Sequence, residues 1–74
     1  MYLLDHLTDR DLELLEMLEI EIEDKEYEGE EVADINNMIA TALEDFYTDD
    51  EELTREFEAL VDKFMDLEYE AFTY

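Results

Sequence analysis

Residues 31–47, EVADINNMIATALEDFY, hold the clearest structural signal in this chain. Apolar side chains recur there at steps of three or four residues, which is the spacing of one face of an α-helix. The members of this stripe are Val32, Ile35, Ile39, Ala42, Leu43 and Phe46. Asn36 and Asn37 fall between apolar positions. The stretch therefore predicts an amphipathic helix over about 31–47, with one side available for a core.

A second helix is expected to follow almost at once. Residues 48–53 read TDDEEL, in which Thr48 and Glu51 match the T-x-x-E capping box. Four acids crowd this first turn, where the helix dipole favours negative charge. Apolar residues then continue at helical spacing nearly to the end of the chain, at Leu53, Phe57, Leu60, Val61, Phe64, Leu67 and Ala71. We expect a helix over about 49–72, with Phe46, Phe57 and Phe64 in the core.

The first third of the chain predicts a helix over about 9–27, with one competing interpretation. Thr8 is a suitable N-cap, and Asp11 lies where a capping box needs its acid. Gly29, the only glycine, fits a helix stop. The apolar stripe is formed by Leu12, Leu15, Leu18 and Ile22, widened by Leu14. Residues 18–23, LEIEIE, however alternate apolar and acidic side chains strictly, so a short strand there stays open as the alternative.

These elements predict an all-α fold, a small three-helix bundle in a single domain spanning residues 1–74. A chain of 74 residues forms one domain at most. The hydrophobic content of 47% and the near absence of Gly and Pro argue against disorder. A core of this size is marginal, and association into a homodimer would help it.

The composition removes the commonest catalytic and metal-binding chemistry. The chain has no Ser and no Cys, so the two commonest nucleophiles are missing. His6, the only histidine, lies near the N-terminus, where we expect a surface or packing role. Asp9, Asp11 and Glu13 alternate as in an EF-hand loop, but Leu14 follows and no glycine comes after it. We expect no enzymatic activity, no cofactor and no metal site.

Charge is the dominant fact of the sequence. Twenty-six acids face four bases, for a formal net charge of -22, whereas solubility of a small domain needs only about 2–8. One-signed charge destabilises a compact state, and such costs tend to mark function. Halophilic adaptation and imitation of a nucleic acid would both explain why nearly all of the charge is negative. The acid excess argues against direct binding of nucleic acid or of an anionic membrane.

The N-terminal residues, MYLLDHLTDRD, have no basic segment and only a short apolar run. We therefore expect neither a signal peptide nor a membrane span, and a cytoplasmic location.

The acids recur at helical spacing on two of the expected helices. On the last one, Glu58, Asp62, Asp66 and Glu70 repeat every four residues, about 6 Å apart on one face. On the first, the corresponding residues are Glu13, Glu16, Glu19, Glu23 and Glu26. Residues 9–31 place one acid per roughly 3 Å of helix, while a DNA strand has one phosphate per about 3.4 Å. We interpret these nine side chains as mimics of phosphates.

With its densest acid runs in LEIEIEDKEYEGEE (18–31) and TDDEEL (48–53), the chain resembles the small acidic proteins that bacteriophages make against host DNA-binding proteins. The likeness is one of charge and size over the whole chain. It implies an inhibitor that occupies the basic surface of a sliding clamp, a nucleoid protein or a restriction enzyme, in the cytoplasm of an infected bacterium. The phage inhibitors of the replication sliding clamp are the most similar in size and acidity.

The Gln-Leu peptide that usually enters the clamp pocket is absent, since the chain has no Gln. A clamp inhibitor of this sequence would therefore act through its charge. An acidic protein–protein interaction module without DNA mimicry remains the alternative function.

Tyrosine is common on binding surfaces, because its ring packs against the partner and its hydroxyl forms hydrogen bonds. Four tyrosines that fall among acids or at the chain end are therefore expected contacts to a partner or a second copy, namely Tyr27, Tyr47, Tyr69 and Tyr74. The C-terminal LEYEAFTY, with Met65 and Phe72, fits either the core or a dimer seam, and both stay open.

Overall fold

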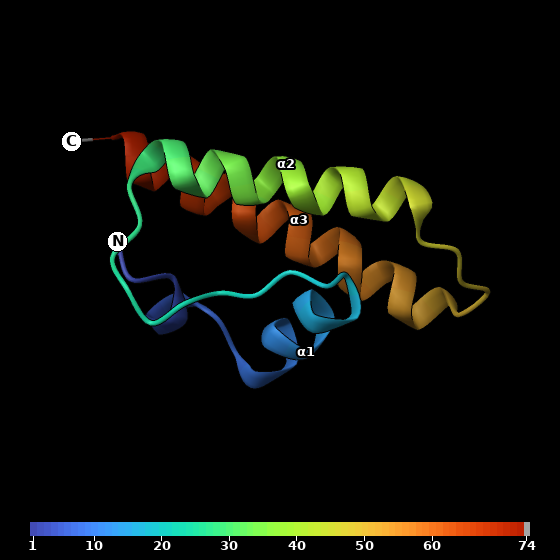
Figure 1. The fold of residues 1–74 in the computed structure, drawn as a ribbon. Helices are drawn as coiled ribbons and strands as arrows, with labels where there is room; N and C mark the ends of the chain where they lie inside the picture. Colours follow the sequence, from blue (N-terminus) through green and yellow to red (C-terminus); the bar gives the residue numbers. More distant parts are fainter. Residues whose placement is uncertain (74) are drawn as a thin grey trace.

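Two long antiparallel helices frame the molecule (Figure 1). A computed structural model describes residues 1–73 and contains α2, Gly29–Asp45, and α3, Glu51–Phe72. A short 3₁₀ helix, η1 (Leu3–His6), and α1 (Asp9–Met17) precede them. The body measures 40 × 19 × 17 Å, so it is a short rod whose length is set by the α2–α3 hairpin.

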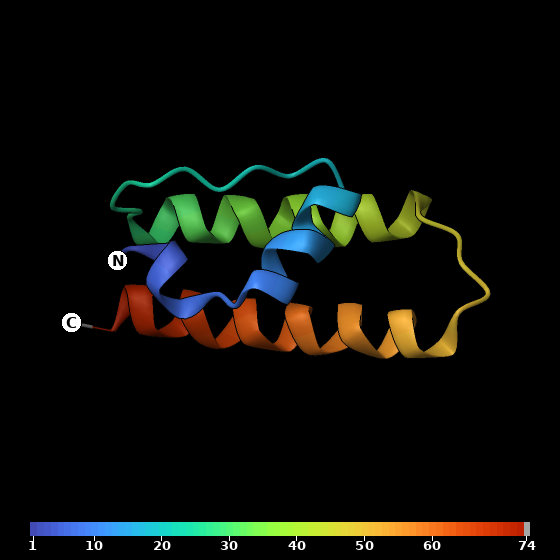
Figure 2. The ribbon, with the colours of Figure 1, turned by 90° about the horizontal axis from the view of Figure 1, so that it is seen from below.

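The N-terminal part of the chain covers one face of this hairpin (Figure 2). α1 lies across α2 and α3, and η1 lies near the end of the rod where α2 begins and α3 ends. Residues 20–28, which we call the extended segment, then run back beside α2 without forming a helix. The expected all-α fold with three helices is confirmed.

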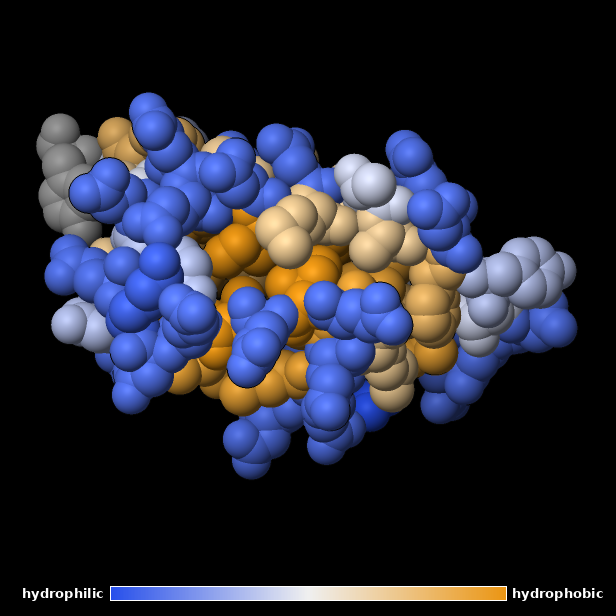
Figure 3. Space-filling model, viewed as in Figure 1, coloured by the Kyte–Doolittle hydropathy of each residue, from blue (hydrophilic) through white to orange (hydrophobic). Residues whose placement is uncertain are grey.

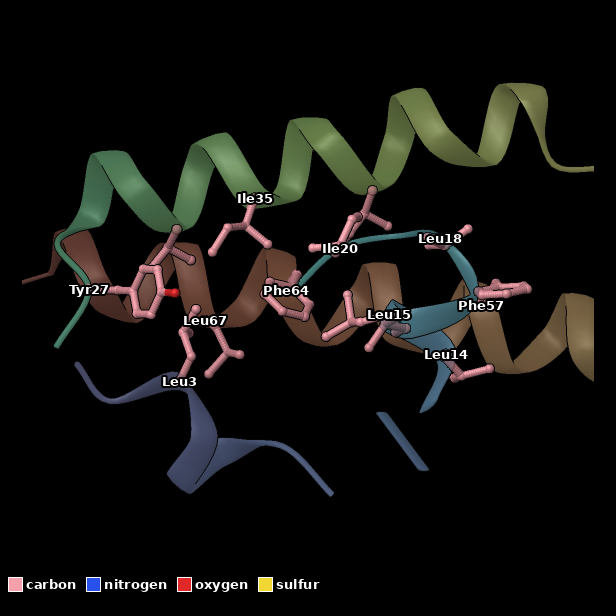
Figure 4. Close-up of a cluster of buried hydrophobic side chains, with 13 residues drawn as sticks. Leu3, Leu14, Leu15, Leu18, Ile20, Tyr27, Ile35, Phe57, Phe64 and Leu67 are labelled. Atoms are coloured by element: carbon pink, nitrogen blue, oxygen red, sulfur yellow. The ribbon is translucent and has the colours of Figure 1, made fainter. Parts of the chain in front are cut away.

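Apolar side chains from every one of these elements meet between the hairpin and its cover (Figure 4). Phe64 lies in the middle of α3 and is 0% exposed. Phe57 is also buried, and Phe46 packs edge-on against it, with ring centroids 5.1 Å apart. The thirteen buried residues are Leu3, Leu14, Leu15, Leu18, Ile20, Tyr27, Val32, Ile35, Ile39, Phe57, Leu60, Phe64 and Leu67.

The helix expected over 9–27 ends ten residues early. Its start is as expected, because Thr8 Oγ1 accepts from Asp11 N–H (3.1 Å) and Asp11 accepts from Thr8 N–H (2.9 Å). Its end is a Schellman motif: Ile20 N–H bonds the Leu15 carbonyl and Glu19 N–H bonds the Glu16 carbonyl, both at 2.9 Å. The left-handed residue that this motif requires is Glu19, with φ of 61°.

Gly29 has a different role from the expected helix stop. It is the first residue of α2, and its φ is not positive. A Cβ atom at this position would lie 2.8 Å from the ring of Phe72. Glycine here therefore permits close approach between the start of α2 and the end of α3.

The LEIEIE alternation corresponds to extended chain but not to a strand. Ile20 is buried and Ile22 is half-buried, while Glu21 and Glu23 are exposed. Within residues 1–73 the only β pairing is an isolated bridge between Tyr2 and Glu26. Neither the helix over 18–27 nor the strand at 18–23 forms, because the segment packs its isoleucines on the core with no neighbouring strand.

The N-cap of α3 is Asp50, so the expected Thr48–Glu51 capping box is wrong. The Asp50 carboxylate accepts from the N–H groups of Glu52 and Leu53, at 3.0 and 3.1 Å. A carboxylate satisfies these N–H groups and also interacts favourably with the helix dipole. Thr48 instead accepts from the N–H of Asp50 at 3.1 Å.

In the part of the chain that the structure describes, no helix combines the length and the apolar character needed to cross a membrane.

We predict that Glu19→Gly stabilises the protein. A side chain in the left-handed region costs about 1 kcal/mol, and glycine removes this cost. For a domain of this size that gain corresponds to a rise in Tm of about 4–8 °C. Glu19→Gln is the matched control, because it removes the same charge and keeps the Cβ atom. Equal Tm values for the two variants would assign the effect to charge and contradict the backbone argument.

Candidate functional site

The acidic side chains form the surface of the rod, and none of the 26 is buried. Twenty-two are exposed. The four half-buried ones each accept a hydrogen bond from another side chain, in the pairs Asp11–Lys63, Glu31–Lys25, Glu56–Arg10 and Glu68–Asn36. The carboxylates are therefore either solvated or bonded.

α3 carries the row of acids expected from the spacing. Glu58, Asp62, Asp66 and Glu70 are all exposed, and the unbroken helix from 51 to 72 places them on its solvent side. The core residues Phe57, Leu60, Phe64 and Leu67 occupy the opposite side. At 1.5 Å per residue the row is about 18 Å long. It is a line of negative charge along nearly half of the rod.

The five N-terminal acids do not form such a row, which corrects the expected helical face. Glu13 and Glu16 lie on α1, and Glu19 lies in the turn that ends it. Glu23 and Glu26 lie in the extended segment. All five are exposed, so they contribute charge but no helical repeat. Sequence spacing misplaced the last two because α1 ends at Met17.

Acids that the helical spacing did not single out cover the remaining sides of the rod. They are exposed on the extended segment and on α2; those up to Glu30 belong to the dense acid run at 18–31, and the net charge is the only sequence signal for the others. These residues are Glu21, Asp24, Glu28, Glu30, Asp34, Glu44 and Asp45.

Three of the four basic side chains are bound within the molecule. Arg10 joins α1 to α3 through Glu56 (2.5 Å) and also bonds Glu13 (2.8 Å). Lys63 joins α3 to Asp11 of α1. Lys25 links the extended segment to Glu31 of α2 at 2.9 Å and lies over the Tyr27 ring. Lys25 also lies 3.9 Å from Glu23, and the N-terminal amine pairs with Glu26. Within residues 1–73 these six ion pairs leave 20 acids without a cationic partner.

The pKa of Asp11 is below its ordinary value. Partial burial of this carboxyl raises the pKa, but the hydrogen bonds from Lys63 and Thr8 together outweigh burial. The bond from Lys25 likewise lowers the pKa of Glu31, and it raises the pKa of Lys25. The bonds to Glu56 and Glu13 raise the pKa of Arg10.

The four expected tyrosine contacts have different positions. Tyr47 and Tyr69 are 88% and 72% exposed, so both are available to a partner. Tyr27 is in the core, only 7% exposed, and its hydroxyl accepts from the N–H of Glu23. It is therefore not a surface contact. Tyr74 lies outside the described residues.

Exposed apolar surface adjoins the acids in two places. Between α2 and α3 an open groove of about 460 Å³ is lined by Leu43, Phe46, Phe57 and Val61, with Glu58 and Asp62 at its rim. On another face, apolar side chains show between α2 and the extended segment, framed by hydrophilic ones (Figure 3). Met65 and Phe72 are also more than half exposed, so these two side chains are not core, whereas Leu67 between them is buried.

Within residues 1–73 no group of three or more His, Asp or Glu side chains is arranged to hold a metal ion. Comparison with protein-family models, with curated proteins and with solved structures finds no match.

We predict that Asp11→Asn destabilises the protein by about 1–3 kcal/mol at pH 7, because it weakens both the helix cap and the bond to Lys63. A carboxyl whose pKa is lowered by folding stabilises the folded state above its unfolded pKa, and this contribution is lost as pH falls. The difference in free energy of unfolding between Asp11→Asn and the parent protein should therefore shrink below pH 3.8, the ordinary pKa of this carboxyl group. Urea unfolding across pH measures it. Asp9→Asn, an exposed first-turn control, should stay within about 0.5 kcal/mol of the parent.

Salt should stabilise the free protein, because the 20 unpaired acids repel one another and salt screens that repulsion. We expect Tm to rise between about 0.05 M and about 0.5 M NaCl, over which the Debye length falls severalfold. Tetramethylammonium chloride at equal ionic strength is the control for specific ion binding and should give the same rise. A Tm that does not change in either salt would contradict the prediction.

Proposed function

We propose that this protein is an inhibitor that imitates DNA and occupies the basic DNA-binding surface of another protein. The proposal rests on the negative charge that the protein carries per unit length. A net charge of -22 over a rod 40 Å long is one negative charge per about 1.8 Å. Duplex DNA carries one per about 1.7 Å of helix axis. To a basic partner, a single copy therefore presents nearly the charge density of the duplex.

The distribution of the acids favours a target that encloses DNA. Exposed carboxylates lie on α1, the extended segment, α2 and α3, so every side of the rod is negative. A protein that binds DNA on one face would use only part of this charge. A ring or channel lined with lysine and arginine would use all of it. A sliding clamp is therefore the preferred target, ahead of nucleoid proteins and restriction enzymes.

The internal placement of the cations supports the same function. Arg10, Lys25 and Lys63 are held in ion pairs with acids of this chain. Their charge is compensated locally and opposes a basic partner little. Long-range attraction would steer association and make it sensitive to salt. Apolar contacts, such as those offered beside Glu58 and Asp62, would add the specificity that charge alone lacks.

The homodimer expected from the small core stays a prediction. DNA mimicry does not require a dimer, since one copy already has nearly the charge density of a duplex.

We predict that reversing Glu58, Asp62, Asp66 and Glu70 to lysine abolishes inhibition, because the row then repels a basic surface. The fold should be retained or stabilised, because the four reversals lower the net charge from -22 to -14 and so reduce repulsion across the whole molecule. Binding to a purified bacterial sliding clamp, with a nucleoid protein and a restriction enzyme in parallel, measures the effect. The control replaces the same residues with Gln and Asn, and it should weaken binding less than reversal does.

Competition with duplex DNA decides between mimicry and a general acidic interaction module. At constant ionic strength, DNA and the protein should exclude each other from the target. If a target binds both at once, with neither weakening the other, DNA mimicry is wrong and an interaction module without mimicry remains.

A further inference from the structure

The extended segment has the side-chain pattern of a β-strand but no partner strand. Ile20 and Ile22 pack against the core, while Glu21 and Glu23 face solvent. This two-residue period is that of a half-buried strand. Within residues 1–73 its far end pairs with the N-terminus, Glu26 with Tyr2 and Tyr27 with Met1, but no strand lies beside residues 20–23. The two isoleucines can share a face because the chain is extended here, whereas residues two apart lie on different faces of a helix.

The backbone of the segment offers free hydrogen-bonding groups. Ile20 N–H bonds the Leu15 carbonyl and Glu23 N–H bonds the Tyr27 hydroxyl, each at 2.9 Å. Between them, the N–H groups of Glu21 and Ile22 donate to no protein group in residues 1–73. Successive N–H groups of an extended chain point to opposite edges, so each edge has a free donor. Such an edge is a template for another strand.

A groove of about 460 Å³ runs along one side of this edge, between α1 and the extended segment. It combines three apolar side chains with three carboxylates. Its lining residues are Leu12, Glu16, Glu19, Ile20, Glu21 and Ile22. The hollow on the α2 side of the segment has Glu19 as its only charged residue. The α1 side is therefore the better match for a basic occupant.

We infer that this groove accepts an extended segment of the target protein in which lysine or arginine alternates with small or β-branched apolar residues. Main-chain bonds to the free edge would provide affinity, and the alternating side chains would provide specificity. Basic side chains would lie beside Glu16, Glu19 and Glu21, and apolar ones on Leu12 and Ile22. A second copy is a poor occupant, because pairing the segment with itself would set glutamates opposite one another.

This inference deepens the proposed function and rests on it for the basic character of the partner. The charged rod attracts the target as a whole, and the open edge binds one strand or loop of it. The charge of the rod is not specific for one basic protein, whereas an edge pairs only with an accessible extended chain.

The test uses a synthetic peptide, acetyl-Lys-Val-Lys-Val-Lys-Val-amide, and a control that is N-methylated at the central Val and Lys. N-methylation blocks both peptide edges and keeps the charge. We expect the unmodified peptide to bind about tenfold more tightly, as a few lost main-chain bonds imply. Its binding should slow hydrogen exchange of the Glu21 or the Ile22 amide. Equal affinity of the two peptides, or unchanged exchange at both amides, overturns the inference.

A matched pair of variants tests whether the peptide binds in the groove between α1 and the extended segment. Glu16→Lys with Glu21→Lys should abolish binding of the peptide, while Glu58→Lys with Asp62→Lys changes the net charge equally on α3 and should retain most of it. Equal losses in the two variants would mean that charge alone binds the peptide, which also overturns the inference. Failure to compete with duplex DNA would leave these peptide results unchanged, so the inference and the proposed function fail separately.

Discussion

Mutual repulsion among 26 acids constrains every other feature of this fold, because only four basic side chains oppose them. The cost is limited by placement. No acid is buried, and acids occupy the first turn of each α-helix, where the dipole favours them. The thirteen buried apolar residues must still outweigh the repulsion that remains. The long α2–α3 hairpin suits this balance, since it spreads the charge along 40 Å while keeping one continuous core.

The few cations are placed where they hold elements together. Arg10 and Lys63 bond acids across the contact between α1 and α3, and Lys25 fastens the extended segment to α2. Ion pairs between exposed side chains contribute little free energy. Their effect here is on position: α1 is only nine residues long, and two cross-links fix how it lies on the hairpin. The same bonds compensate positive charge that would otherwise oppose a basic partner.

The two long helices could be predicted from sequence because their apolar stripes are long and regular, and the α3 acid row followed from the same spacing. The end of α1 could not. A glycine is the usual signal for a helix stop, but the stop lies at Glu19, in a turn that brings Ile20 beside Leu15 in the core. Gly29 serves instead a close approach to Phe72. Both roles depend on tertiary contacts. The positions of Glu23 and Glu26, the burial of Tyr27 and the groove beside α1 all follow from where that helix ends.

The charge that is unfavourable in the free protein becomes favourable in a complex with a basic surface. In the free molecule 20 acids lack a cationic partner, and their repulsion lowers the stability of the fold. A basic partner that binds only the folded form relieves that repulsion and stabilises the fold by linkage. Salt then acts in opposite directions on the two states, because screening stabilises the free fold and weakens the complex. Opposite salt dependences of folding and binding would therefore arise from one set of carboxylates, which distinguishes a DNA mimic from a domain whose acids only keep it hydrated in concentrated salt.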